Sequence, residues 1–206
     1  MGEIVERFPL FPLGLVLLPG EVVPLHIFEE RYKAMVSDCL EAESEFGILW
    51  MGDEGLKEIG CSARVSQVIE RMDDGRLNIL VEGTRAFRLE RRIDDMEYPA
   101  GEVELLDEDR TPVGDESGPA ARAEYANLVE RVTDSRPEAE DLAGLSAYAM
   151  AATIALELDA KQQLLEIRDE GGRLERLAAL CAKALERFDY AQRAAESAQT
   201  NGKVPH

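Results

Sequence analysis

The sequence predicts an α+β protein in which a β-rich N-terminal domain precedes a helical bundle. Three observations lead to this fold class: a proline-punctuated apolar opening, alternating apolar and polar residues over 59–93, and helical spacing of apolar residues beyond 118. We expect a β-barrel-like domain over 1–110 and an acidic, Gly- and Pro-rich linker over 111–119. A helical bundle over 120–196 and a disordered tail over 197–206 complete the predicted organisation.

The opening segment Phe8–Phe28 is apolar enough to suggest a membrane span. Four prolines interrupt it: Pro9, Pro12, Pro19 and Pro24. Proline breaks helix interiors, and a spanning helix needs about 20 nearly uninterrupted apolar residues. A secretory signal also fails, because Glu3 and Glu6 stand where cations are required. The segment therefore predicts two short strands, Phe8–Leu10 and Val22–Phe28, joined by a Pro-Gly turn.

An amphipathic helix of about three turns is expected after Phe28. Its apolar residues fall at i, i+3, i+4, i+7 and i+8: Tyr32, Met35, Val36, Cys39 and Leu40. A short apolar strand, Glu45–Met51, and a turn at Gly52–Gly55 follow. This helix is the one helix that we expect inside the β-rich domain.

A long hairpin comes next. Ile59–Met72 alternates with the period of a half-buried strand, and an Asp-Asp-Gly turn leads into Arg76–Ile93. The second strand is too long to be straight, and glycine inside a strand often marks a bend, so Gly83 is the expected corner. Glu102–Leu106 is the expected last strand. Short, mostly antiparallel strands favour a small, partly closed barrel, since closure hides strand edges.

Four helices are predicted beyond the linker. They are Ala120–Thr133, Leu145–Leu158, Ala160–Arg168 and Gly172–Glu196. Leu145–Leu158 is apolar nearly all round, which indicates a central, buried helix. Asp159 followed by Gln162 is typical of a helix start.

Composition weighs against several functions. The net charge of −19 opposes binding to nucleic acid, which needs Lys and Arg for phosphates, and opposes docking on anionic lipid. Three widely spaced cysteines form no disulfide framework and no CxxC metal site, so buried thiols are expected. Without an export signal, the expected compartment is the cytoplasm.

No catalytic constellation is visible. His26 lies in an apolar strand and is interpreted as a hydrogen-bonded histidine at the barrel rim rather than a base. A GxxxxGK[ST] loop is missing, and carboxylate pairs are expected among 42 acidic residues. We therefore predict a protein that is not an enzyme, with no catalytic residue, no metal site and no cofactor.

Four blocks of sequence carry a family resemblance. In chain order they are Pro12-Leu13 through Pro24-Leu25-His26-Ile27-Phe28, Glu58-Ile59-Gly60-Cys61, Asp74-Gly75 through Val81-Glu82-Gly83-Thr84-Arg85-Ala86-Phe87, and Lys161-Gln162-Gln163-Leu164-Leu165-Glu166 with Arg173-Leu174. Together they resemble the N-terminal, substrate-binding domain of the Lon ATP-dependent proteases, over roughly residues 8 to 190. The expectation is a stand-alone member that lacks the ATPase and protease domains.

The resemblance implies a PUA-like β-barrel with one inserted helix and a C-terminal helical bundle. It also implies a non-catalytic module that binds exposed or unfolded segments of client proteins, with a full-length ATP-dependent protease as a candidate partner. Neither nucleic acid nor membrane is an expected partner. Two alternatives stay open, an RNA-binding PUA-like module and a small-molecule-binding barrel. The first would need a basic surface.

Candidate binding residues are Phe28, Tyr32, Trp50 and Arg85. We expect an apolar groove near Phe28 and Trp50, or between barrel and bundle. Trp50 and Met51 end a strand, where they are either core residues or, for the aromatic, a binding anchor. Arg85 shares its predicted sheet face with apolar residues, so its charge is either paired with a carboxylate at the barrel corner or directed at a ligand.

Overall fold

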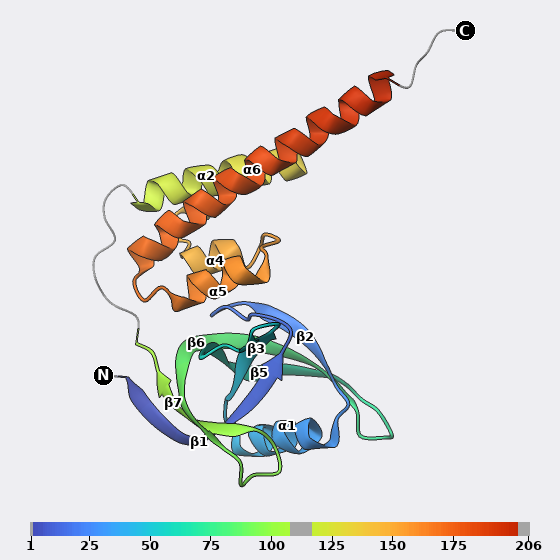
Figure 1. The fold of residues 1–206 in the computed structure, drawn as a ribbon, viewed down its shortest axis with the longest axis vertical. Helices are drawn as coiled ribbons and strands as arrows, with labels where there is room; N and C mark the ends of the chain where they lie inside the picture. Colours follow the sequence, from blue (N-terminus) through green and yellow to red (C-terminus); the bar gives the residue numbers. More distant parts are fainter. Residues whose placement is uncertain (1, 108–116, 202–206) are drawn as a thin grey trace. The chain divides into compact units, whose positions relative to one another are not determined.

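The computed structural model describes residues 2–107 and 117–201, and it confirms the predicted α+β class. Its elements, in chain order, are β1 (Glu3–Leu13), β2 (Val22–Ile27), α1 (Glu30–Ala42), β3 (Phe46–Gly52), β4 (Gly55–Leu56), β5 (Ile59–Arg71), β6 (Leu77–Ile93), β7 (Ala100–Leu105), α2 (Ser117–Thr133), α3 (Ala139–Leu142), α4 (Ala147–Ala151), α5 (Leu158–Glu166) and α6 (Glu170–Asn201) (Figure 1).

The chain forms two compact units that interleave along the sequence. Unit 1 comprises Met1–Arg110 and Tyr148–Asp169, and unit 2 comprises Thr111–Ala147 and Glu170–His206. This division differs from the predicted one, which places all helices beyond residue 120 in one bundle. The difference arises because α5 is bonded to the strands of unit 1.

The sheet of unit 1 follows the order β1-β7-β6-β5-β3-β4. β1 also pairs in parallel with β3, Leu10–Leu13 lying beside Gly47–Trp50, so the path of pairings returns to β1. β1 is longer than the predicted strand Phe8–Leu10 because its first residues, from Glu3 to Val5, pair with β7.

β6 changes partner along its length. Its first half, Leu77–Glu82, pairs with β2, and its second half, Phe87–Ile93, pairs with β7. Gly83 lies between the two halves. A Cβ atom added there would come within 2.3 Å of the Leu18 carbonyl oxygen, so only glycine fits without a shift of the backbone. The position agrees with the predicted corner.

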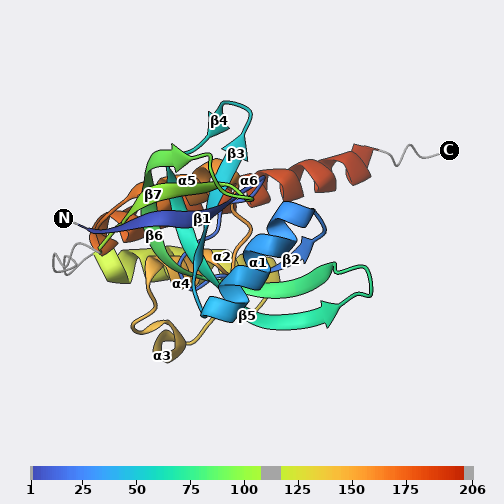
Figure 2. The ribbon, with the colours of Figure 1, turned by 90° about the horizontal axis from the view of Figure 1, so that it is seen from below.

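One apolar cluster fills the interior beside β1, β6 and β7. Its buried residues are Phe8, Leu10, Leu49, Phe87, Val103 and Leu105. α1 lies across one end of the strands (Figures 1 and 2). Tyr32 of this helix lies against Phe11 of β1, with ring centres 4.1 Å apart. The predicted apolar stripe of α1 thus faces the strands.

The predicted helix Leu145–Leu158 is wrong. α4 ends at Ala151, and α5 begins only at Leu158. The Thr153 hydroxyl donates a hydrogen bond of 2.8 Å to the Met150 carbonyl oxygen, which is a local bond of the kind that competes with helix continuation. Of the apolar run, Ala147, Tyr148, Met150 and Ala151 are buried, whereas Leu145, Ile154 and Leu156 are half-buried.

Two side chains tie α5 to the strands of unit 1. Lys161 donates to the carboxylate of Glu21, and the Gln162 amide donates to the Ile59 carbonyl oxygen at 3.1 Å. Both donors are largely buried. These bonds explain why a segment remote in sequence belongs to unit 1.

Unit 2 is built around α2 and α6, which lie side by side (Figure 1). Ser117 bonds Glu175 and Arg131 bonds Asp189, so the two helices run in the same direction. α2 begins inside the predicted linker, of which 111–116 lies outside the described residues. α6 continues to Asn201, into the predicted tail, and 202–206 lies outside the described residues.

α3 was not predicted from the sequence. It is a four-residue turn of helix, Ala139–Leu142, which is too short to show an apolar period (Figure 2). Within 2–107 and 117–201, none of the helices combines the length and the apolarity that crossing a bilayer requires.

Replacing Gly83 by alanine should destabilise the protein by about 3 kcal/mol, because the new methyl group meets the Leu18 backbone at the bend of β6. Urea unfolding measures the change. Gly14→Ala is the control, since a Cβ atom added at Gly14 would have no neighbour within 4 Å, and its effect should stay within about 1 kcal/mol. Equal effects of the two substitutions would contradict the steric explanation.

Glu21→Gln should destabilise the protein by about 2 kcal/mol, because it leaves the Lys161 ammonium largely buried without its carboxylate. The matched control is Glu82→Gln, which removes an exposed pair with Arg64 and should cost less than about 1 kcal/mol. The midpoints of urea unfolding should therefore separate the two variants. Similar midpoints would show that the Glu21–Lys161 pair does not anchor α5.

Candidate functional site

Unit 1 contains an open hollow of about 390 Å³, which we call the Met51 pocket. Most of its lining is apolar: Leu10, Pro12, Met51, Leu56, Ile93, Met96, Pro99 and Ala100. Tyr98 and four charged residues complete the lining: Arg31, Arg92, Asp94 and Glu97. The volume lies in the range of small-ligand pockets, which is sufficient for one or two side chains of a bound chain.

The β3–β4 hairpin forms one wall of the Met51 pocket. Met51 and Leu56 are direct cross-strand partners, and the tight turn between them requires a positive φ of 108° at Gly55. Met51 is 45% exposed, which is unusual for a methionine beside apolar neighbours. Its flexible thioether can adapt to apolar groups of different shape.

A second part of the lining comes from the end of β6 and its connection to β7. This segment contributes Ile93, Met96 and Pro99, and it is held in place by Tyr98, whose hydroxyl donates a hydrogen bond of 2.9 Å to Asp38 of α1. Burial, followed by this hydrogen bond, raises the pKa of Tyr98 to about 12. The phenol therefore stays protonated and keeps donating at neutral pH.

Two of the predicted binding residues lie beside the pocket without lining it. Tyr32 is only 5% exposed, and its ring supports the pocket residue Arg31, whose guanidinium lies 4.5 Å from the ring centre. Trp50 precedes Met51 in β3, so its side chain leaves the opposite face of the strand. Its ring lies under the ammonium of Lys57, 5.6 Å from the ring centre.

The other two predicted binding residues lie elsewhere on unit 1. Phe28 is 60% exposed directly after β2 and stacks on His26, with ring centres 5.9 Å apart. Arg85 forms ion pairs with Glu3 at 3.4 Å and with Asp107 at 3.6 Å. The structure thus gives Arg85 carboxylate partners and does not bring it to the pocket.

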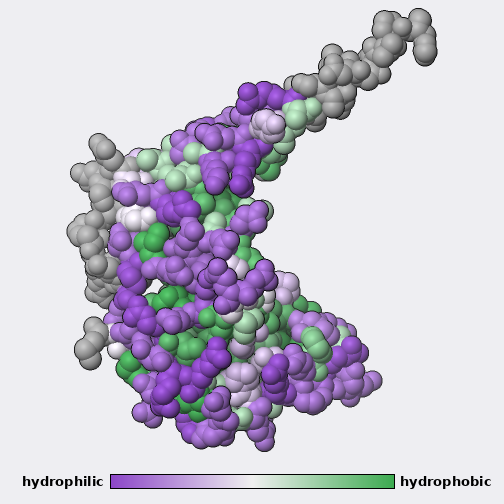
Figure 3. All heavy atoms as spheres, in the orientation of Figure 1, coloured by the Kyte–Doolittle hydropathy of each residue, from purple (hydrophilic) through white to green (hydrophobic). Residues whose placement is uncertain are grey.

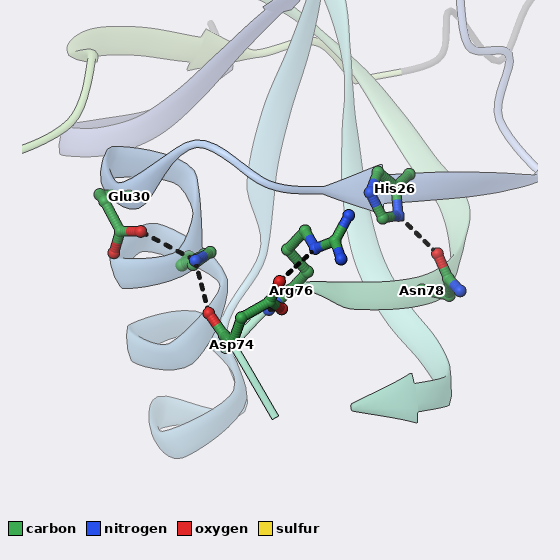
Figure 4. Close-up of polar contacts among 6 residues, drawn as sticks. His26, Glu30, Asp74, Arg76 and Asn78 are labelled. Carbon is green, nitrogen blue, oxygen red and sulfur yellow. Dashed lines mark hydrogen bonds and ion pairs between the residues drawn. The ribbon is translucent and has the colours of Figure 1, made fainter. Parts of the chain in front are cut away.

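His26 has the hydrogen bond that the sequence predicts for it. Its Nδ1 lies 2.7 Å from the Asn78 side-chain oxygen on the neighbouring strand (Figure 4). Nearby, Lys33 of α1 bonds Glu30 and the Asp74 carbonyl oxygen, and the Asp74 carboxylate accepts a hydrogen bond from Arg76 (Figure 4). Each polar group here fixes a turn or strand end, which is a structural role.

Metal binding finds no support in the side-chain arrangement. Across the described part of the chain, no three His, Cys, Asp or Glu side chains gather in a way that could hold an ion. All three cysteines are buried thiols, and burial raises the pKa of Cys39 and Cys181. Such thiols are weak nucleophiles and weak metal ligands.

Sequence reasoning missed most of the pocket. Leu56, Ile93, Met96 and Pro99 are ordinary apolar residues of strands and turns, and the pocket exists only where their strands meet. One signal was available: Met96 stands alone among acidic residues in the segment Asp94–Glu97. An apolar residue in such a polar connection has no core position to explain it.

A family model matches this chain over residues 7–183, and the family is the ATP-dependent protease La (LON) substrate-binding domain. A Lon protease of Paraburkholderia phytofirmans is 25% identical over 97% of this chain and 27% of its own length. Lon protease 2 of Desulfotalea psychrophila is 27% identical over 87% of this chain and 25% of its own length. The chain spans about a quarter of the length of these curated relatives.

Solved structures show the same fold. The crystal structure of a Lon N-terminal domain protein from Xanthomonas campestris has a TM-score of 0.65 and 29% identity, covering 85% of this chain and 98% of that chain. The N-terminal domain of a Mycobacterium avium complex Lon protease has a TM-score of 0.63 at 23% identity, covering 86% and 98%. At that identity, the second likeness concerns the fold alone.

Tyr98→Phe should lower the free energy of unfolding by about 1 kcal/mol at neutral pH, because it removes the hydrogen bond to Asp38. The raised pKa favours the protonated phenol in the folded state. The contribution of the Tyr98 hydroxyl to the free energy of unfolding is therefore complete below the ordinary pKa of 10.0, and it is lost as the pH rises toward about 12. Urea unfolding at about pH 8 and about pH 11 should show the difference between wild type and variant shrinking. A difference that is constant with pH would contradict the assignment.

Proposed function

Because the chain belongs to the family of ATP-dependent protease La (LON) substrate-binding domains, we propose that it is a non-catalytic module that recognises exposed or unfolded segments of client proteins. The observation that carries the proposal is the Met51 pocket, which is apolar, open and large enough for single side chains. Exposed apolar side chains are the feature that distinguishes an unfolded segment from a folded surface.

The chemistry of the pocket suits clients of varied sequence. Met51 and Met96 both line the pocket, and methionine side chains repack around different apolar groups at little cost. A bound segment would be recognised by a few apolar side chains and by little else.

The predicted binding residues take different parts in this proposal. Phe28, exposed after β2, would contact a bound segment directly. Tyr32 and Trp50 would act indirectly, the first by positioning Arg31 and the second by supporting the hairpin that carries Met51. Arg85, paired with Glu3 and Asp107, would stabilise the strands of unit 1.

Two further parts of the proposal concern fold and partners. The ring of pairings from β1 through β7, β6, β5 and β3 back to β1 supports a PUA-like barrel. The family supports a full-length ATP-dependent protease as a partner that would receive the client. The net charge of −19 weighs against nucleic acid as the ligand, since phosphate binding needs cations.

Binding to an apolar, unfolded peptide is the direct test, and Met51→Asp is the informative variant. We expect saturable binding by the wild type at micromolar concentration, weakened by at least about tenfold in Met51→Asp, because a carboxylate in the pocket must be desolvated when an apolar side chain enters. Fluorescence anisotropy of a labelled peptide measures both affinities. Ile69→Asp, at another exposed apolar side chain of unit 1 outside the pocket, is the matched control.

Absence of binding to any apolar peptide at tens of micromolar would refute the recognition function. Equal loss in Met51→Asp and Ile69→Asp would refute the Met51 pocket as its site. Tight binding of RNA at low salt would instead favour the RNA-binding alternative.

A further inference from the structure

The charged side chains around the Met51 pocket differ in how they are paired. Arg31 is engaged by Glu29, with its Nη2 atom 2.8 Å from the carboxylate, and it lies over the Tyr32 ring. Arg92, Asp94 and Glu97 line the same pocket and take part in no ion pair within the described residues. Two carboxylates and one guanidinium are therefore available to a bound segment.

The neighbouring arginines of β6 do not add positive charge to the rim. Arg88 pairs with Glu104 at 3.5 Å, and Arg91 pairs with Glu102 at 3.0 Å across the β6–β7 strand pair. The chain as far as Arg110 contains 12 Lys or Arg and 25 Asp or Glu. The three unpaired lining groups, two carboxylates and one guanidinium, sum to a charge of −1 within a part of the chain that is itself acidic, which raises the local concentration of cationic groups.

We propose that the Met51 pocket selects client segments in which apolar residues are flanked by Lys or Arg; this inference rests on the proposed function. The apolar side chain enters between Met51 and Met96, and a neighbouring cation reaches Asp94 or Glu97 at the rim. Lys and Arg also have apolar stems, which can cover the edge of the pocket while their charged ends stay in water. Segments flanked by Asp or Glu meet two repelling carboxylates against the one attracting guanidinium of Arg92.

Three labelled peptides with one apolar core test the selectivity. The core is flanked on both sides by Lys, by Gln or by Asp, and affinity for the complete chain is measured by fluorescence anisotropy at low salt. The Lys-flanked peptide should bind about fivefold more tightly than the Gln-flanked one, and the Asp-flanked peptide should bind more weakly. Because exposed charges are screened, these differences should shrink at about 0.5 M salt.

A charge-matched pair of variants separates the rim from the overall charge. Asp94→Asn combined with Glu97→Gln should abolish most of the preference for the Lys-flanked peptide. Asp73→Asn combined with Glu43→Gln removes the same charge from two exposed carboxylates that do not line the pocket and should keep the preference. Binding of the Gln-flanked peptide should be similar in all three proteins.

Equal affinity for all three peptides, or tighter binding of the Asp-flanked one, would overturn the selectivity and leave apolar recognition intact. Equal loss of preference in both double variants would also overturn it, because the effect would then belong to the net charge. Failure of all three peptides to bind would overturn the proposed function and this inference together.

Discussion

The bend of β6 at Gly83 is the constraint on which the rest of unit 1 depends. The turn that precedes β2 lies directly against it: the Gly20 amide donates to the Gly83 carbonyl oxygen at 2.8 Å, and the Gly83 amide donates to the Glu21 carbonyl oxygen at 2.9 Å. These bonds satisfy the backbone where ladder pairing is interrupted. On either side of Gly83, β6 pairs first with β2 and then with β7. The second half then leads into the connection that forms one wall of the Met51 pocket.

The same turn also holds α5. The Glu21 carboxylate accepts a hydrogen bond from the Leu18 amide at 3.0 Å and a second from Lys161. Lys161 and Gln162 belong to one of the sequence blocks that resemble the Lon family, and the structure gives both residues a physical role in unit 1. Glu21 thus bonds the β1–β2 connection and α5, more than a hundred residues away in sequence, through its buried carboxylate, and the corner of β6 through its backbone carbonyl oxygen.

Local patterns predicted the fold well and the site poorly. The strands, the hairpin, the corner at Gly83 and the apolar face of α1 all depend on residues close in sequence. The position of α5 depends on contacts with residues that are distant in sequence. An apolar period indicates a helix but does not identify the surface against which it is buried. The pocket could not be predicted from local sequence either, because Met51 and Met96 come together only through the pairing of distant strands. Tyr32 is a candidate binding residue from the sequence, yet the apolar stripe to which it belongs turns it toward Phe11.

The apolar Met51 pocket is exposed on a protein whose surface is strongly charged. Ion pairs between neighbouring strands engage many cations of unit 1, including Arg64, Arg88 and Arg91. Hydrophilic residues dominate the face shown in Figure 3. An exposed apolar surface normally favours self-association. A net charge of −19 opposes it, because two copies that approach repel each other, whereas a short client segment of lower charge does not experience the same barrier. In the proposed function, the acidity of the chain would therefore act on recognition itself, by favouring entry of short segments into the Met51 pocket over contact with a second copy of the protein.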